Sequence, residues 1–202
     1  NGPLGAAWGD MAFRQGSAGP GWRQNFQGGI LVQSGYGFQV VPYSSVLMTW
    51  LGLGDGTGFL GWPTGAYGCT GSGCVQQFAG GMISSSSWGT YYSYGGISGH
   101  WASHSGPSAL GPAVSVLRYS AINGGGWAQH FGAGVITQAA GGSAIFTPYG
   151  PILNTWYHYG AEYTWLGWPT AGQTCSAGTC TQPFQHGIAI SDPSGGVAFN
   201  PR

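Results

Sequence analysis

Acidic side chains are the first groups that could do chemistry, and the chain has only four of them. Hydrolysis of a glycosidic bond needs two carboxyl groups held close together, one as an acid and the other as a base or nucleophile. The four lie far apart along the chain, and nothing in their spacing brings two together. We therefore expect no catalytic pair among Asp10, Asp55, Glu162 and Asp192.

Serine, histidine and glycine offer no better active site. Serine is abundant, but the chain has no Gly-x-Ser-x-Gly elbow. His100 and His104 could chelate a metal from one helix face, but Gly99 and Gly106 argue against a long helix there. A phosphate cradle usually needs a lysine, and the chain has none. The sequence predicts neither an enzyme nor a cofactor, and each histidine is interpreted as a hydrogen-bonded surface or interface residue.

Charge is nearly absent, which excludes several kinds of partner. Charged residues make up 4% of the chain and the formal net charge is zero. Binding to nucleic acid or to an anionic membrane surface needs clustered lysine or arginine, and no apolar run approaches the roughly 20 residues of a membrane-spanning helix. Aromatic residues reach 15%, which is typical of a folded chain and not of a disordered one.

The four cysteines form two closely spaced pairs, and two interpretations are open. All four could bind a zinc ion, but the spacing is wide for zinc and the intervening loops carry no histidine or acid. Two local disulfides, each worth about 2 kcal/mol by chain entropy, are favoured. Disulfides imply an exported protein. The expected bonds are Cys69 to Cys74 and Cys175 to Cys180.

Sugar binding is the chemistry that suits the aromatic side chains best. A tryptophan ring covers the apolar face of a sugar ring at low cost in conformational entropy. Tryptophans with no recurring place in the sequence are better candidates than those that follow a repeated pattern, and a tryptophan beside a proline can equally be packing. The ligand candidates are Trp8, Trp88 and Trp165, followed by Trp62 and Trp168.

The elements that position these residues come in repeats. Leu60 to Thr64 reads Leu-Gly-Trp-Pro-Thr and returns as Leu166 to Thr170, with both cysteine pairs at the same offset. A weaker Leu-Gly motif at Leu4 and at Leu110 divides each half again. We expect a single repeat domain over residues 1–202, with units at about 4–59, 60–109, 110–165 and 166–202.

Each unit is predicted to have a β-β-α plan. Alternation around a Gln-x-Phe-x-x-Gly-aliphatic motif predicts strands at 22–32, 75–83, 127–137 and 180–190, each followed by a second strand. Short helices, two of them after Pro42 and Pro148 and a third around Ile97, should bury Trp50, Trp156 and Trp101, whereas 14–21 reads as a surface loop. We expect a mainly β (α+β) fold whose four units close radially, as in a propeller, with a linear solenoid as the alternative.

These motifs resemble the LGFP repeat family. The resemblance rests on Leu-Gly-Trp-Pro-Thr, on Phe-Gln-Gly-Gly-Ile at 26–30, and on Ile152 and Trp156 before the next Leu-Gly. In that family the repeats accompany cell-wall enzymes of actinobacteria or occur in surface proteins, and are thought to bind the wall. The resemblance implies a secreted, non-catalytic anchoring module that recognises arabinogalactan or peptidoglycan. Trp62 and Trp168 depart from the family by replacing its phenylalanine.

A second class of function also suits the composition. Soluble monomers usually keep more surface charge than this chain has. The chain could therefore be a structural or assembly protein that packs against copies of itself or against another exported protein. Association that depends on concentration would distinguish this class from wall binding.

Overall fold

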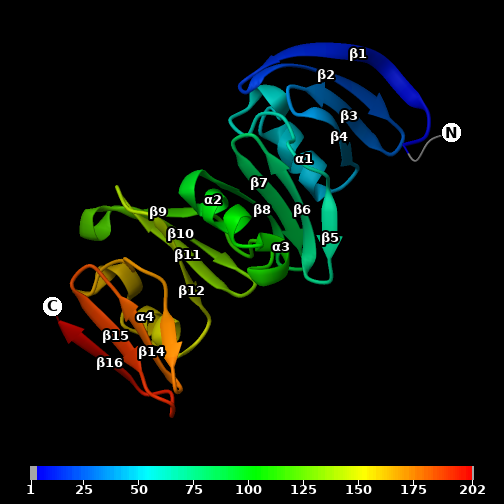
Figure 1. The fold of residues 1–202 in the computed structure, drawn as a ribbon. Helices are drawn as coiled ribbons and strands as arrows, with labels where there is room; N and C mark the ends of the chain where they lie inside the picture. Colours follow the sequence, from blue (N-terminus) through cyan, green and yellow to red (C-terminus); the bar gives the residue numbers. More distant parts are fainter. Residues whose placement is uncertain (1–3, 202) are drawn as a thin grey trace.

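The structure is a computed structural model that describes residues 4–201. These residues form four antiparallel sheets of four strands, and in each sheet the strands lie side by side in sequence order (Figure 1). We number the sheets one to four along the chain. The fold is mainly β with short helices, as the sequence predicted.

The strands and helices have the following bounds. Sheet one holds β1 (Ala7–Gly16), β2 (Gly19–Phe26), β3 (Gly29–Ser34) and β4 (Gly37–Pro42). Sheet two holds β5 (Gly68–Thr70), β6 (Gly73–Phe78), β7 (Gly81–Ser86) and β8 (Gly89–Tyr94). Sheet three holds β9 (Arg118–Ser120), β10 (Gly126–Phe131), β11 (Gly134–Ala139) and β12 (Ala144–Pro148). Sheet four holds β13 (Thr174–Ser176), β14 (Thr179–Pro183), β15 (Gly187–Ser191) and β16 (Val197–Pro201). The helices are α1 (Ser45–Gly52), α2 (Gly95–Ser103), α3 (Gly106–Ala109) and α4 (Pro151–His158), and short 3-10 turns lie at Asp55–Thr57, Ile122–Gly124 and Ala161–Tyr163.

The Gln-x-Phe-x-x-Gly motif forms a tight hairpin, so the single strands predicted at 22–32, 75–83, 127–137 and 180–190 were wrong. Phe26 pairs with Gly29, and only Gln27 and Gly28 lie between them. A turn with an even number of residues leaves the alternation of apolar side chains intact, so the pattern runs through the turn as if it were one strand. The equivalent closing pairs are Phe78 with Gly81, Phe131 with Gly134 and Phe184 with Gly187.

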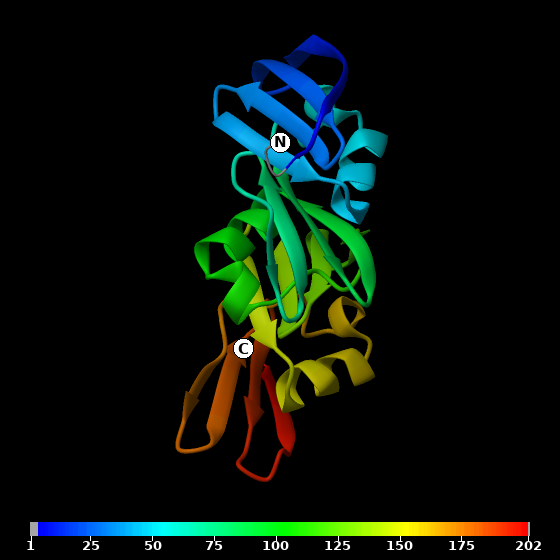
Figure 2. The ribbon, with the colours of Figure 1, turned by 90° about the vertical axis from the view of Figure 1, so that its right-hand side faces the viewer.

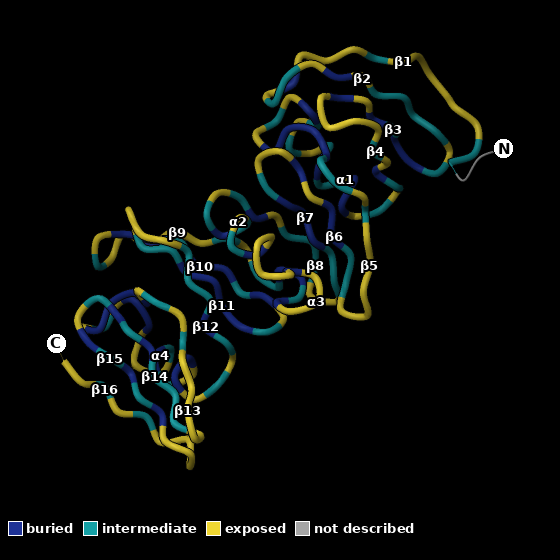
Figure 3. Tube along the Cα trace, viewed as in Figure 1, coloured by how far each residue is buried: buried dark blue, intermediate teal, exposed yellow. Residues whose placement is uncertain are grey.

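Each unit also has one strand more than the β-β-α plan allowed. Residues 14–21, expected as a surface loop, lie in β1, in β2 and in the turn between them. The extra strand is the exposed edge of its sheet, and its residues are mostly solvent-facing in β1, β5 and β13 (Figure 3). Without a buried face, such a strand shows no apolar alternation, which is why its sequence resembles a loop.

The helices bury the expected tryptophans but begin later than predicted. Pro42 and Pro148 end strands β4 and β12, and the helices follow. The Ser44 side chain caps α1 by accepting from the Leu47 amide. Pro151 opens α4, where its missing N–H costs no intrahelical bond.

Three hydrophobic cores lie between successive sheets. Each core combines one face of a sheet, a helix, a Leu-Gly motif and the facing side of the next sheet. In the first core, Ile30 of sheet one and Phe78 of sheet two enclose Trp50 of α1 and Leu60. The tryptophans at the centres of the three cores are Trp50, Trp101 and Trp156, all at most 1% exposed.

The sheets follow one another from end to end of an extended molecule (Figures 1 and 2). Helix α1 contacts β7 and β8 of the next sheet, α2 contacts β11 and β12, and α4 contacts β15 and β16. The residues described form no closed barrel or propeller, so the radial arrangement is not confirmed. The linear succession named as the alternative is the arrangement seen.

Candidate functional site

Each junction between units is fixed by a tryptophan of the helix. The indole Nε1 of Trp50 donates to the Gly61 carbonyl at 3.0 Å, and that of Trp101 donates to the Gly111 carbonyl at 2.7 Å. Trp156 donates to the carbonyl of Gly167 at 3.1 Å. The acceptor is therefore always the glycine of a Leu-Gly motif. The same glycines have φ of 66°, 74° and 75°, the left-handed region that glycine tolerates best.

The repeated glutamine is a second tie between units. Gln76 Nε2 donates to the carbonyl of Val40 in the preceding sheet at 3.0 Å, and Gln129 Nε2 donates to that of Tyr92 at 3.1 Å. Gln182 reaches the preceding sheet through the Thr147 hydroxyl at 2.7 Å. Buried amides of this kind are interpreted as structural and not as ligand-binding groups.

Two of the candidate tryptophans are buried and cannot present a face to a ligand. Trp62 and Trp168 are 0% exposed. Trp62 donates to the Gly19 carbonyl at 2.8 Å, and Trp168 donates to that of Ile122 at 3.0 Å, so each reaches back to the preceding unit. The prediction that they are ligand candidates was therefore wrong, because both rings fill space beside glycines of the preceding sheet.

Trp8, Trp88 and Trp165 are exposed but lie in three separate places. Trp8 is in the edge strand β1, and Trp88 is at the tip of the β7–β8 hairpin with 72% of its surface exposed. Trp165 directly precedes a Leu-Gly motif, as Phe59 does at the end of unit one, so it does follow the repeat. The structure therefore separates the three candidates.

Trp88 borders a cleft of about 490 Å³ where unit two meets unit three. The cleft lies against β10 and the chain around Val114 and Ser115. His130 and Tyr149 line it with Trp88. An aromatic face and hydrogen-bonding groups thus share one hollow, a combination common in sites for small polar ligands.

His130 is held between two tyrosines. The Tyr149 hydroxyl lies 3.2 Å from Nδ1, and the Tyr157 hydroxyl lies 3.1 Å from Nε2. Burial, and then the charge of Arg118, lower the pKa of His130. Burial raises the pKa of Tyr157 to about 12. Both groups are therefore neutral at pH 7, and in a neutral imidazole one ring nitrogen donates while the other accepts.

A second hollow of about 230 Å³ also borders His130. It is lined by Arg118, Ala128 and Tyr157, among others. The charge of Arg118 is neutralised by Glu162 at 2.6 Å, whose side chain is completely buried. Burial alone would raise the pKa of Glu162, but the hydrogen bond and charge of Arg118 lower it. The first hollow thus presents the neutral His130 and Tyr149, and the second adds Arg118 as a cation paired with Glu162.

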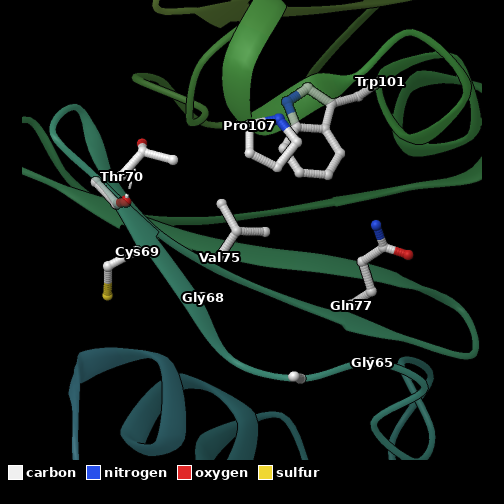
Figure 4. Close-up of a pocket in the computed structure, with 10 residues that line it drawn as sticks. Gly65, Gly68, Cys69, Thr70, Val75, Gln77, Trp101 and Pro107 are labelled. Carbon is white, nitrogen blue, oxygen red and sulfur yellow. Dashed lines mark hydrogen bonds between the residues drawn. The ribbon is translucent and has the colours of Figure 1, made fainter.

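Unit two has a matching arrangement around Gln77, which stands where His130 stands in unit three, directly after the buried glutamine of the motif. One hollow of about 330 Å³ lies between β6 and the α2–α3 region, with Val75 and Gln77 pointing towards Trp101 and Pro107 (Figure 4). A second hollow of about 320 Å³ shares Gln77 and Trp101 with it. The same place in two units is therefore a polar side chain that borders two hollows.

Both predicted disulfides are present. Cys69 bonds Cys74 and Cys175 bonds Cys180, each across a pair of neighbouring strands at the edge of its sheet. Figure 4 shows Cys69 on the side of the strand facing away from Trp101. The disulfides are therefore elements of the scaffold.

Comparison with known families agrees with the repeat pattern. Residues 60–108 match the family model described as LGFP repeat. The chain contains an LGFP repeat. A comparison with curated proteins gives no match. The matched LGFP repeat starts at the Leu-Gly-Trp-Pro-Thr motif, runs through sheet two and ends within α3, so it carries the hollows at Gln77 and the tip residue Trp88.

Neither a metal site nor a membrane-spanning helix is found among the described residues. Within residues 4–201, no three His, Cys, Asp or Glu side chains are grouped so that they could hold a metal ion. The helices described there are all too short or too polar to cross a bilayer. Sequence reasoning missed His130, Tyr149 and Tyr157, because these positions differ between units; variation at a fixed place in a repeat was the available signal.

Proposed function

We propose that this chain is a non-catalytic module that attaches an exported protein to polysaccharide of the cell envelope, and that the cleft at His130 is its principal site. The observation that carries the proposal is the placing of an exposed tryptophan beside neutral hydrogen-bonding groups. Trp88 can cover the apolar face of a sugar ring, while His130 and Tyr149 meet its hydroxyl groups.

Neutral glycan suits the site better than an anionic one. Arg118 is paired with Glu162, and the chain has no lysine. A largely neutral polymer such as arabinogalactan is therefore the preferred ligand, ahead of peptidoglycan with its charged peptides. The disulfides support an exported protein, since such bonds persist in oxidising compartments.

Several weak sites would act together on a polymer. The hollows at Gln77 and His130 occupy the same place in successive units, so one glycan chain can contact both. Once one site is bound, the second faces an effective concentration in the millimolar range, which multiplies weak affinities.

The direct test is pull-down of the purified chain on delipidated actinobacterial walls, before and after removal of arabinogalactan. We expect binding that is lost with arabinogalactan and weakened about tenfold, or about 1.4 kcal/mol, by Trp88→Ala. Trp165→Ala removes an equally large ring outside the cleft and should bind as the unaltered chain does. Absence of binding to either wall preparation would refute wall attachment; retention after arabinogalactan removal would point to peptidoglycan.

Self-assembly is the second candidate, and one observation favours it. The face of sheet one that points away from the rest of the molecule carries exposed aromatic side chains, among them Phe38 at 73% exposure. Sedimentation over a hundredfold range of concentration tests this function, and a monomer throughout would remove it.

A further inference from the structure

In every unit, one face of the sheet carries the phenylalanine of the Gln-x-Phe motif. In three of the four sheets, other elements cover this face. In sheet two, Phe78 and Ile83 are 4% and 0% exposed beneath α1 and its tryptophan. In sheet three, Phe131 and Ile136 are 0% exposed beneath α2. In sheet four, Phe184 of this face is buried beneath α4. The cover always consists of a helix and its buried tryptophan.

The equivalent face of sheet one is open. Phe26 and Leu31 take the places of Phe78 and Ile83 but are only half-buried. Around them Phe13 is 48% exposed and Trp22 is 40% exposed. Their rings pack edge to face with centroids 5.1 Å apart. Strand register places an uncharged set on this face: Phe13, Trp22, Gln24, Phe26, Leu31, Gln33, Phe38 and Val40.

The Leu-Gly motif beside this face has the backbone conformation that accepts a tryptophan at the other junctions. The Gly28 amide donates to the Leu4 carbonyl at 2.8 Å, just as the Gly80 amide donates to that of Leu60 at 2.9 Å. Gly5 has φ of 73°, within the range of the three glycines whose carbonyls accept a tryptophan indole. The backbone of the first motif thus has the junction conformation although residues 4–201 supply no helix to it.

The chain order at the three junctions indicates how the cover is connected. In each case the covering helix ends a short way ahead of the Leu-Gly motif, with one short helical turn between them: α1 ends at Gly52 before Leu60, and α4 ends at His158 before Leu166. A helix with the same short connection would reach the open face from ahead of Leu4. A helix from another molecule would lack this connection.

We propose that the open face of sheet one, with Gly5, is a docking site for the helix-bearing end of another repeat unit joined ahead of Leu4. Its helix supplies an apolar face and a tryptophan that donates to the Gly5 carbonyl. This inference is independent of glycan binding, because it concerns the face opposite α1 and not the clefts at Gln77 and His130.

The test appends residues 60–109 directly ahead of Leu4 of the full chain. In the unaltered chain, α2 of unit two covers sheet three of the unit that follows it. Unit one begins with a Leu-Gly motif as unit three does, so α2 of an appended unit two should cover sheet one in the same way. We expect amide hydrogen exchange of β2 and β3 to slow at least tenfold. Exchange unchanged from that of the unaltered chain would overturn the proposal.

Two substitutions in the appended copy separate docking from mere attachment. Trp101→Ala removes the indole that bonds the motif glycine and should abolish most of the protection. Ser103→Ala alters an exposed side chain at the end of the same helix and should leave the protection intact. Equal protection with both variants would overturn the assigned role of the helix.

A longer appended segment guards against failure of the added unit to fold, since residues 60–109 alone begin with an uncovered sheet. Appending 4–109 supplies that cover and gives the chain two copies of sheet one, of which only one is covered. Its β2–β3 peptides should then exchange in two populations, one slow and one fast. A single fast population would contradict docking. Self-association of the unaltered chain that is abolished by Phe38→Glu would also contradict it, because the open face of sheet one would then bind a second copy of the chain.

Discussion

At the scale of single residues, one buried polar atom distinguishes the first junction from the second. The Gln129 Oε1 atom accepts from the Ser93 hydroxyl at 2.6 Å, whereas Gln76 Oε1 is buried without a partner. Val41 occupies the place of Ser93 at the first junction. An unpaired buried acceptor costs about 1–3 kcal/mol. A hydrogen-bond donor placed beside Gln76 Oε1 should therefore stabilise the first junction.

Val41→Thr should therefore stabilise the chain by about 1 kcal/mol, since threonine keeps the shape of valine and its hydroxyl can donate to Gln76. Urea unfolding measures the change. Val32→Thr is the control, because Val32 is equally buried in the same core and a hydroxyl there should destabilise. Loss of stability in both variants would show that the hydroxyl of Val41→Thr does not reach Gln76.

Glycan binding should depend on the protonation of His130. Burial and then Arg118 lower the pKa of His130, so the ring stays neutral until the pH falls below its ordinary value of about 6.5. Protonation removes the nitrogen that accepts from a tyrosine hydroxyl. We expect constant binding from pH 8 to 6.5 and weaker binding in more acidic solution.

His130→Gln introduces the residue that unit two has at the same place and should remove this acid sensitivity. Wall pull-down at pH 7.5 and pH 5 measures the effect for both proteins. The same acid-induced loss in the variant would assign the pH dependence to another group.

At the scale of the element, α1, α2 and α4 each join two sheets through one tryptophan. Trp156 packs on Phe184 with ring centroids 5.8 Å apart, and its indole donates to the Gly167 carbonyl. The indole ring of Trp156 contributes buried apolar surface, and its Nε1 hydrogen bond fixes the orientation of the ring against the Leu-Gly motif. The two contributions can be measured separately.

Trp156→Phe should cost about 1–2 kcal/mol, chiefly by leaving the Gly167 carbonyl unpaired, and Trp156→Ala should cost about 3–5 kcal/mol through the cavity. Thermal or urea unfolding gives both values. Trp165→Ala, in the same unit but half-exposed, should cost less than either. Equal costs for the two variants at Trp156 would mean that the hydrogen bond dominates.

At the scale of the whole molecule, the cores formed by residues 4–201 are each shared by units that are neighbours in sequence. Three cores separate four sheets, and α1, α2 and α4 each pack between their own sheet and the next. Stability in such an array is approximately a sum of units and interfaces. A ring would instead join the first sheet to the last.

Small-angle scattering distinguishes the two arrangements. A compact domain of this length has a radius of gyration of roughly 16–17 Å. The extended succession of sheets should give a clearly larger value and an asymmetric distance distribution. A compact value, at a concentration where the chain is monomeric, would contradict the open array.

The sequence by itself determined the repeat, the buried tryptophans of the helices and both disulfides, because packing rules act on each unit in the same way. It misplaced the hairpins, since an even turn preserves alternation through Phe26 and Gly29. Only the tertiary structure decided that the units stack in a line, that Trp62 is buried and that Trp88 shares a cleft with His130. Those relations depend on how one unit meets the next, which no local pattern encodes.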